Sequence, residues 1–140
     1  MARYENLPIY KRAMDLAVLL ENAVHGFPRY HKYAIGADLR HLARRLLALV
    51  ITANSRADKV LALTALRDAS EEMKTLIVLG KEIKAFHSFK QFEQAALAAT
   101  EISRQSEGWL KSQRGVRPES RVPRAPGSVP TITVRPPRPA

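Results

Sequence analysis

Apolar residues that recur at alternating spacings of four and three place the strongest limit on how this chain can fold. This spacing returns the apolar side chains to one face of a helix, as bundle packing requires. No alternating β-branched run competes with it in the first 113 residues. We therefore predict an all-α fold, an antiparallel up-down four-helix bundle over residues 1–113. Its four helices are expected at about residues 8–25, 33–54, 55–85 and 88–113.

The second of these segments, Gly36 to Asn54, divides into two halves. Arg40 and Arg44 stand four apart on one flank of its apolar stripe, in the cationic N-terminal half. In the C-terminal half, Leu46 to Ile51, apolar side chains point in every direction. A helix that is apolar all round must be covered on more than one side. We therefore predict contact between subunits in this half, with Leu47 and Ile51 as interface residues.

Signals for the helix ends accompany the periodic pattern. Pro8 suits a first helical position, and Gly26-Phe27-Pro28 is a stop signal in which the glycine would take the left-handed conformation. Pro28 to Lys32 is expected to form a turn. Two sequences resemble capping boxes and would open the third and fourth helices. They are Ser55-Arg56-Ala57-Asp58 and Ser88-Phe89-Lys90-Gln91.

The composition changes abruptly after Gln113. Residues 114–140 hold seven of the nine prolines, six arginines and one acidic residue. Such a segment can neither continue a helix nor bury a core, so we predict a disordered or extended Pro/Arg-rich tail. Two interpretations of it remain open. The tail is either a cationic arm that wraps a nucleic-acid backbone or a solvated terminus.

Positive charge is the most marked feature of the composition. Lys and Arg number 23 against 13 Asp and Glu, which gives a net charge of +10. An excess of this size favours polyanionic partners, with nucleic acid first and an anionic membrane second; the alternative is a protein that uses cations only for solubility. The longest purely apolar run is far shorter than the roughly 20 residues that span a bilayer. The N-terminus lacks the apolar region of a signal peptide, so a cytoplasmic location without membrane attachment is expected.

The common catalytic and metal-binding patterns are missing from the sequence. No Glu is followed by His three residues later, as a di-iron bundle requires, and the four histidines are scattered singly. Cysteine is absent, and there is no Gly-rich phosphate loop, nucleophile elbow or zinc-binding motif. We therefore expect no catalytic residues, no metal and no cofactor.

Basic residues line one flank of the third predicted helix. Arg67, Lys74 and Lys81 recur every seven residues and lie beside the apolar stripe, with Lys84 extending the run. With Arg40 and Arg44 they form six candidate nucleic-acid-binding residues, a ridge able to follow phosphates. The alternative is a set of intrahelical ion pairs, because Glu71 lies four residues after Arg67 and three before Lys74.

Four tyrosines cluster in sequence near the start of the bundle and the first connection. Exposed tyrosines there could stack on bases, as in single-strand binders. The interpretation we favour is that they plug the ends of the bundle. The residues are Tyr4, Tyr10, Tyr30 and Tyr33.

Short motifs occur in a characteristic order from residue 4 to about residue 113. They are Leu7-Pro8-Ile9-Tyr10-Lys11, Phe27-Pro28-Arg29, Tyr33…Gly36…Leu39-Arg40, Ala53-Asn54 and Gly108-Trp109. This set resembles the Avd proteins (accessory variability determinant). They belong to a wider four-helix-bundle family that includes proteins encoded in 23S rRNA intervening sequences. Trp109 and the long third helix favour the Avd branch.

The resemblance implies a role beside a polymerase. Avd proteins of this kind form a positively charged pentameric barrel that binds the reverse transcriptase of a diversity-generating retroelement. They also bind nucleic acid and support mutagenic cDNA synthesis from template-repeat RNA, while the polymerase active site belongs to the partner. The expected partners are therefore a reverse transcriptase, template-repeat RNA or RNA/cDNA, and further copies of this chain.

Three functional hypotheses follow. The first is a non-enzymatic accessory protein that binds RNA and a reverse transcriptase. The second is a structural oligomerisation or protein-interaction module of the rRNA intervening-sequence type, whose only partners are proteins. The third, an enzyme with an unrecognised site, would need a cluster of buried polar groups that the sequence does not indicate.

Overall fold

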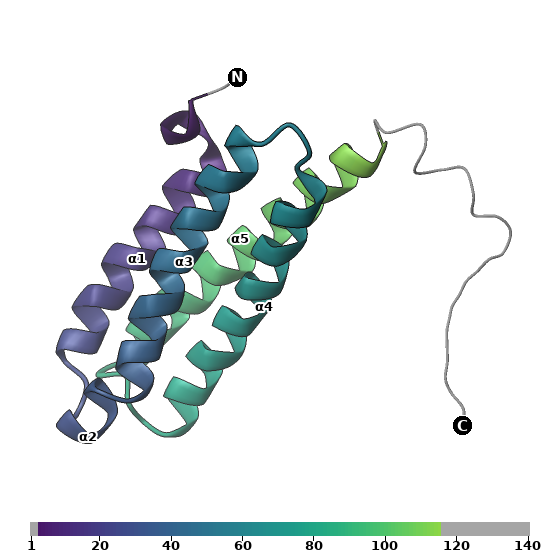
Figure 1. Cartoon of the computed structure of the whole chain (residues 1–140). Coiled ribbons are helices and arrows are strands. Elements are labelled where there is room, and N and C mark those ends of the chain that lie inside the picture. The colour runs from purple at the N-terminus through teal and green to yellow at the C-terminus, as the bar shows by residue number, and fades with distance from the viewer. Residues whose placement is uncertain (1–2, 116–140) are drawn as a thin grey trace, which may run out of the picture. The chain divides into compact units, whose positions relative to one another are not determined.

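The computed structural model describes residues 3–115 as a series of helices joined by short connections (Figure 1). A 3-10 turn, η1 (Tyr4–Asn6), precedes the long helix α1. The remaining elements are α1 (Pro8–His25), the single-turn α2 (Arg29–Lys32), α3 (Ile35–Ser55), α4 (Val60–Glu82) and α5 (Phe89–Gly115). No strand occurs among the described residues, so the prediction of an all-α four-helix bundle is confirmed.

The chain divides into compact units at Leu110, and the packing below is that of the first unit. The predicted boundary between a bundle of residues 1–113 and a tail of residues 114–140 stays a prediction. The predicted disorder or extension of the tail concerns residues that lie, from Val116 onward, outside the described part of the chain.

Contacts between side chains show that neighbouring long helices run antiparallel. Helix α3 packs between α1 and α4. Glu21, near the end of α1, meets Arg40 near the start of α3. Arg67, in the first half of α4, meets Glu107 in the second half of α5. Arg12 of α1 contacts Glu101 of α5, which closes the ring of four long helices.

The core lies along the axis of this ring and follows the predicted stripes with local shifts. Leu39, Leu46 and Val50 of α3 are fully buried. At the end of α4, however, Ile77 is buried, while Ile83, the C-cap residue that follows the helix, is exposed. An α-helix has 3.6 residues per turn, so a strict 4-3 pattern drifts around its surface. The same drift changes the core face of α5, whose buried residues are Ala95, Ala98, Ala99, Ile102, Ser103, Ser106 and Leu110.

The all-round apolar half of α3 is only partly covered by its own chain. Leu46 and Val50 are buried, whereas Leu47, Leu49 and Ile51 are half-buried. A residual apolar surface therefore remains on α3 at the positions predicted to contact another subunit.

The ends of the helices confirm two of the predicted signals. Pro8 is the first residue of α1. The backbone N–H of Gln91 donates to the Ser88 hydroxyl over 3.2 Å, so Ser88 caps α5 as predicted. The predicted turn at residues 28–32 contains the single-turn helix α2.

The predicted capping box at Ser55 is wrong. Ser55 is the last residue of α3, and its hydroxyl donates to the Thr52 carbonyl over 3.1 Å. Helix α4 begins at Val60, after Lys59 as its N-cap, and the Val60 N–H donates to the carboxylate of Asp58. The cause is a competing interaction at the end of α3. The Lys59 ammonium donates to carbonyl oxygens of the outgoing chain, those of Ala53, Asn54 and Arg56, and so satisfies groups that a helix end leaves open.

The prediction that Gly26 takes the left-handed conformation is wrong, and a residue after α4 has that conformation instead. Gly26 has a φ of −92°, whereas Lys84 has a φ of 62°. The Lys84 N–H donates to the Lys81 carbonyl and the Ala85 N–H to the Gly80 carbonyl, the two bonds of a Schellman cap. A lysine therefore occupies a position at which glycine is the least strained residue.

We expect Lys84→Gly to stabilise the protein by about 1 kcal/mol, because glycine adopts the left-handed conformation without a clash of its Cβ. In thermal unfolding followed by circular dichroism, this corresponds to a rise of roughly 4 °C or more for a domain of this size. Lys84→Ala is the control, since it removes the charge and keeps the Cβ. Equal melting temperatures for the two variants would contradict this account of the cap.

Candidate nucleic-acid interface

Arg40 and Arg44 converge on one carboxylate at the seam between α1 and α3. The Arg40 Nε lies 3.0 Å from Oε1 of Glu21, and the Arg44 Nη2 lies 2.9 Å from its Oε2. All three side chains remain substantially exposed, and the group keeps a net positive charge. Surface ion pairs of this kind contribute about 0–1 kcal/mol, so a phosphate can compete with Glu21 for the arginines.

Arg67, Lys74 and Lys81 line the seam between α4 and α5 and are each accompanied by an acidic residue. Arg67 lies 3.1 Å from Asp68 and 3.7 Å from Glu107 of α5. Lys74 pairs with Glu71 at 3.0 Å, the intrahelical pair that the sequence offers as an alternative. This part of the predicted ridge is therefore a row of mixed charge.

Lys81 has two kinds of partner at the same seam. Its ammonium lies 3.2 Å from Glu82 and 5.2 Å from the centre of the Phe92 ring. The ring face attracts the cation and holds it beside α5. Lys84, the last of the six predicted binding residues, differs from the other five. It is exposed on the connection after α4 and forms no ion pair with any described residue.

Glu71 is held in its charged form by contacts across the seam. The hydroxyl of Ser103, a buried residue of α5, donates to Oε2 of Glu71 over 2.5 Å. This hydrogen bond, followed by the one from Lys74, lowers the pKa of Glu71 below its ordinary value. The carboxylate is therefore fixed between α4 and α5, and its charge offsets that of Lys74.

We expect Ser103→Ala to raise the pKa of Glu71 toward its ordinary value, measured by NMR titration of the side-chain carboxyl. A carboxyl group with a lowered pKa in the folded state adds stability above its unfolded pKa and loses it as the pH falls through its folded pKa. The variant should therefore be less stable than the wild type at neutral pH, and the difference should shrink at acidic pH. A difference that does not change with pH would rule out this role for Glu71.

An apolar patch continues the face of α3 that carries the two arginines. Leu47 and Ile51 follow Arg40 and Arg44 at spacings of three and four, so they lie on the same side of the helix. On α1, Met14 and Val18 precede Glu21 at spacings of four and three and are 38% and 53% exposed. Because α1 and α3 are antiparallel and meet at Glu21, these spacings indicate that the four apolar residues lie near one seam; Val18 also lines a groove with Gln91 and Gln94 of α5. We call Met14, Val18, Leu47 and Ile51 the α1/α3 patch.

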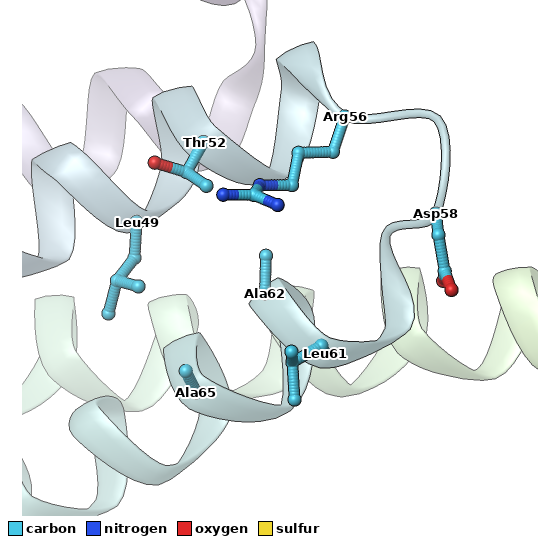
Figure 2. Close-up of a pocket in the computed structure, with 7 residues that line it drawn as sticks. All are labelled: Leu49, Thr52, Arg56, Asp58, Leu61, Ala62 and Ala65. Carbon is cyan, nitrogen blue, oxygen red and sulfur yellow. The ribbon is translucent and has the colours of Figure 1, made fainter.

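Cavities open between helices in the described part of the chain. One of about 270 Å³ lies between the end of α3 and the start of α4 (Figure 2). Arg56 reaches over it, Asp58 points away from it, and Thr52 supplies the one hydroxyl of its lining. Its other lining residues are Leu49, Leu61, Ala62 and Ala65. Within residues 3–115, no group of three or more His, Asp or Glu side chains is placed to hold a metal ion. No helix in the described part of the chain is long and apolar enough to cross a membrane.

Two comparisons with known proteins bear on this arrangement. A family model described as bAvd-like matches residues 7–113, which cover the four long helices almost completely. No curated protein matches the chain.

Proposed function

The chain belongs to the bAvd-like family, a family of accessory proteins, and from this premise we propose a specific role. It is a non-enzymatic accessory protein of a diversity-generating retroelement. It binds the reverse transcriptase and template-repeat RNA and supports mutagenic cDNA synthesis, while the partner carries the polymerase active site. The observation that carries this proposal is the family match over residues 7–113.

The charge of the chain supports the nucleic-acid part of the proposal. The net charge is +10, and basic residues line two seams of the bundle, at α1/α3 and α4/α5. Phosphates that replace the acidic partners of these side chains release bound counterions, which favours association at low salt. The protein then acts by positioning the RNA, and no step of the chemistry is assigned to its own side chains.

The proposed assembly is a homo-oligomer, a pentamer as in the Avd proteins that the sequence resembles. The α1/α3 patch supports it, because Leu47 and Ile51 keep part of their apolar surface exposed beside Met14 and Val18. Covering this surface with another subunit removes apolar area from water, at roughly 25 cal/mol per Å².

One observation favours the second candidate, a module whose only partners are proteins. Five of the six predicted nucleic-acid-binding residues form ion pairs with carboxylates of their own chain. If those pairs persist in the functional state, the two seams are structural and the charge excess serves another purpose.

Neutralising the α4/α5 seam tests the two candidates against each other. We expect Arg67→Gln, Lys74→Gln and Lys81→Gln together to weaken RNA binding at least about tenfold. Each cation removed from a phosphate should also lower the slope of the logarithm of affinity against the logarithm of salt concentration by about one. Binding is measured by fluorescence anisotropy, and helix content by circular dichroism.

The control for the seam variant neutralises three exposed cations elsewhere on the bundle, Lys11, Arg45 and Arg104. It removes the same number of charges and should weaken RNA binding less. Unchanged RNA binding in the seam variant would remove Arg67, Lys74 and Lys81 from the site.

The oligomer interface is tested by placing charge in the α1/α3 patch. We expect Leu47→Asp or Ile51→Asp to lower the oligomeric mass measured by light scattering, because a carboxylate in a buried contact must be desolvated. Leu61→Asp is the control, since Leu61 is 80% exposed and lies outside the patch. A monomeric wild-type protein would contradict the interface outright.

A further inference from the structure

One end of the bundle is built from two connections that the core brings together. The segment between α1 and α3 and the segment between α4 and α5 lie at the same end (Figure 1). Their rings meet edge to face, with 5.2 Å between the centres of Phe27 and Phe86. Gly80 permits the position of Phe86, because a Cβ at Gly80 would lie 2.8 Å from the Phe86 ring.

Aromatic side chains project from this end into solvent. Tyr30 is 84% exposed, Tyr33 71% and Phe89 64%. The interpretation that the tyrosines plug the bundle is therefore wrong for Tyr30 and Tyr33. The interpretation holds better at the opposite end, where Tyr10 packs against the core. The ring of Tyr4 contacts the ring of Tyr10 there, with 5.2 Å between the two ring centres. Phe27 and Phe86 close the end that carries α2 instead, so Tyr30 and Tyr33 are not needed to cover the core there.

The cations at this end differ from those of the two seams. Neither connecting segment, residues 26–34 or 83–88, contains an acidic residue. Four basic residues of this end form no ion pair with any described residue. Five of the six predicted binding residues, by contrast, do form ion pairs. The four are Arg29, Lys32, Lys84 and Lys90. Their charge is therefore available without breaking a contact inside the protein.

The backbone at Lys84 adds a further indication. A left-handed lysine is strained relative to a relaxed conformation, and glycine would avoid that strain. The Schellman cap fixes Lys84 in this conformation, and its charge lies on the connection, close in sequence to Lys90 and Phe89. Strain retained in a folded protein concentrates at positions that function uses.

From this arrangement we propose that the tyrosine end of the bundle binds single-stranded nucleic acid. It is defined by Tyr30, Tyr33 and Phe89 with the four cations named above. Unpaired bases stack on the aromatic rings, and the cations hold the phosphates between them. Stacking requires bases that are not already stacked in a duplex, so the site discriminates single strands from double strands. The inference rests on the proposed nucleic-acid-binding function and adds to it a location and a preference for unpaired strands.

The test measures how one pair of substitutions changes the binding of single-stranded RNA and of duplex RNA. Tyr30→Ala with Tyr33→Ala should weaken binding of a labelled oligouridine of about 12 nucleotides at least tenfold, because each stacked base contributes about 1–3 kcal/mol. Binding of an RNA duplex of the same length should change less than about twofold, since its phosphates are reached without stacking. Affinities are measured by fluorescence anisotropy, and folding is checked by circular dichroism.

Two matched variants make the result specific. Tyr30→Phe with Tyr33→Phe keeps the rings and should retain single-strand binding. Leu61→Ala with Val78→Ala removes exposed apolar side chains elsewhere on α4 and should leave it unchanged.

The unfavourable outcomes separate the two proposals. An equal decrease for both RNA forms, or no decrease for either, overturns the tyrosine end as a single-strand site and leaves the proposed function standing. A change in oligomeric mass or loss of a protein partner with RNA binding intact assigns this end to a protein interface and also overturns the inference. A wild-type protein that binds neither form overturns the proposed function and this inference together.

Discussion

The packing of large against small side chains in one core is the constraint on which the bundle depends. Helices α1, α3 and α4 supply large side chains such as Leu16, Leu46 and Met73, all fully buried. Most of the buried residues of α5 are small, among them Ala95 and Ser106, and they stand beside the fully buried Ile102 and Leu110. Cores reach high density only when large and small residues face one another. On the flank of this core, the polar residues Ser103 and Glu107 of α5 reach side chains of α4.

This packing decides where the charges of the protein can act. At the seams, close approach of the helices brings basic side chains to carboxylates, so Arg40 and Arg44 share Glu21 and Lys74 is held by Glu71. At the end that carries α2, the connections contain no acidic residue. The chain thus combines seams of mixed charge with one end whose cations are unpaired among the described residues. A protein that binds nucleic acid without catalysing a reaction needs this kind of surface more than it needs a cavity.

The sequence predicted the helices well because their signals are local. Periodicity located α1, α3, α4 and α5, and the Ser88 cap is formed as expected. It failed where a contact from another part of the chain decides the outcome. Lys59 reaches the carbonyls of α3 and displaces the predicted cap at Ser55, a choice that no local pattern shows. The six candidate binding residues were proposed from their spacing. Spacing alone could not show that Glu21 and Glu107, on neighbouring helices, pair with three of them. The exposure of Tyr30 and Tyr33 was hidden because it depends on Phe27 and Phe86 closing the same end.

The central claim is that this bundle is a cationic accessory protein that binds RNA. Its most direct test is the affinity of the wild-type protein for a structured RNA across a range of salt concentrations. Binding through phosphates predicts that the logarithm of the association constant falls linearly with the logarithm of the salt concentration, with a slope of about −0.9 per phosphate contact on a duplex. Absence of binding even at low salt, or an affinity that does not depend on salt, would contradict the claim.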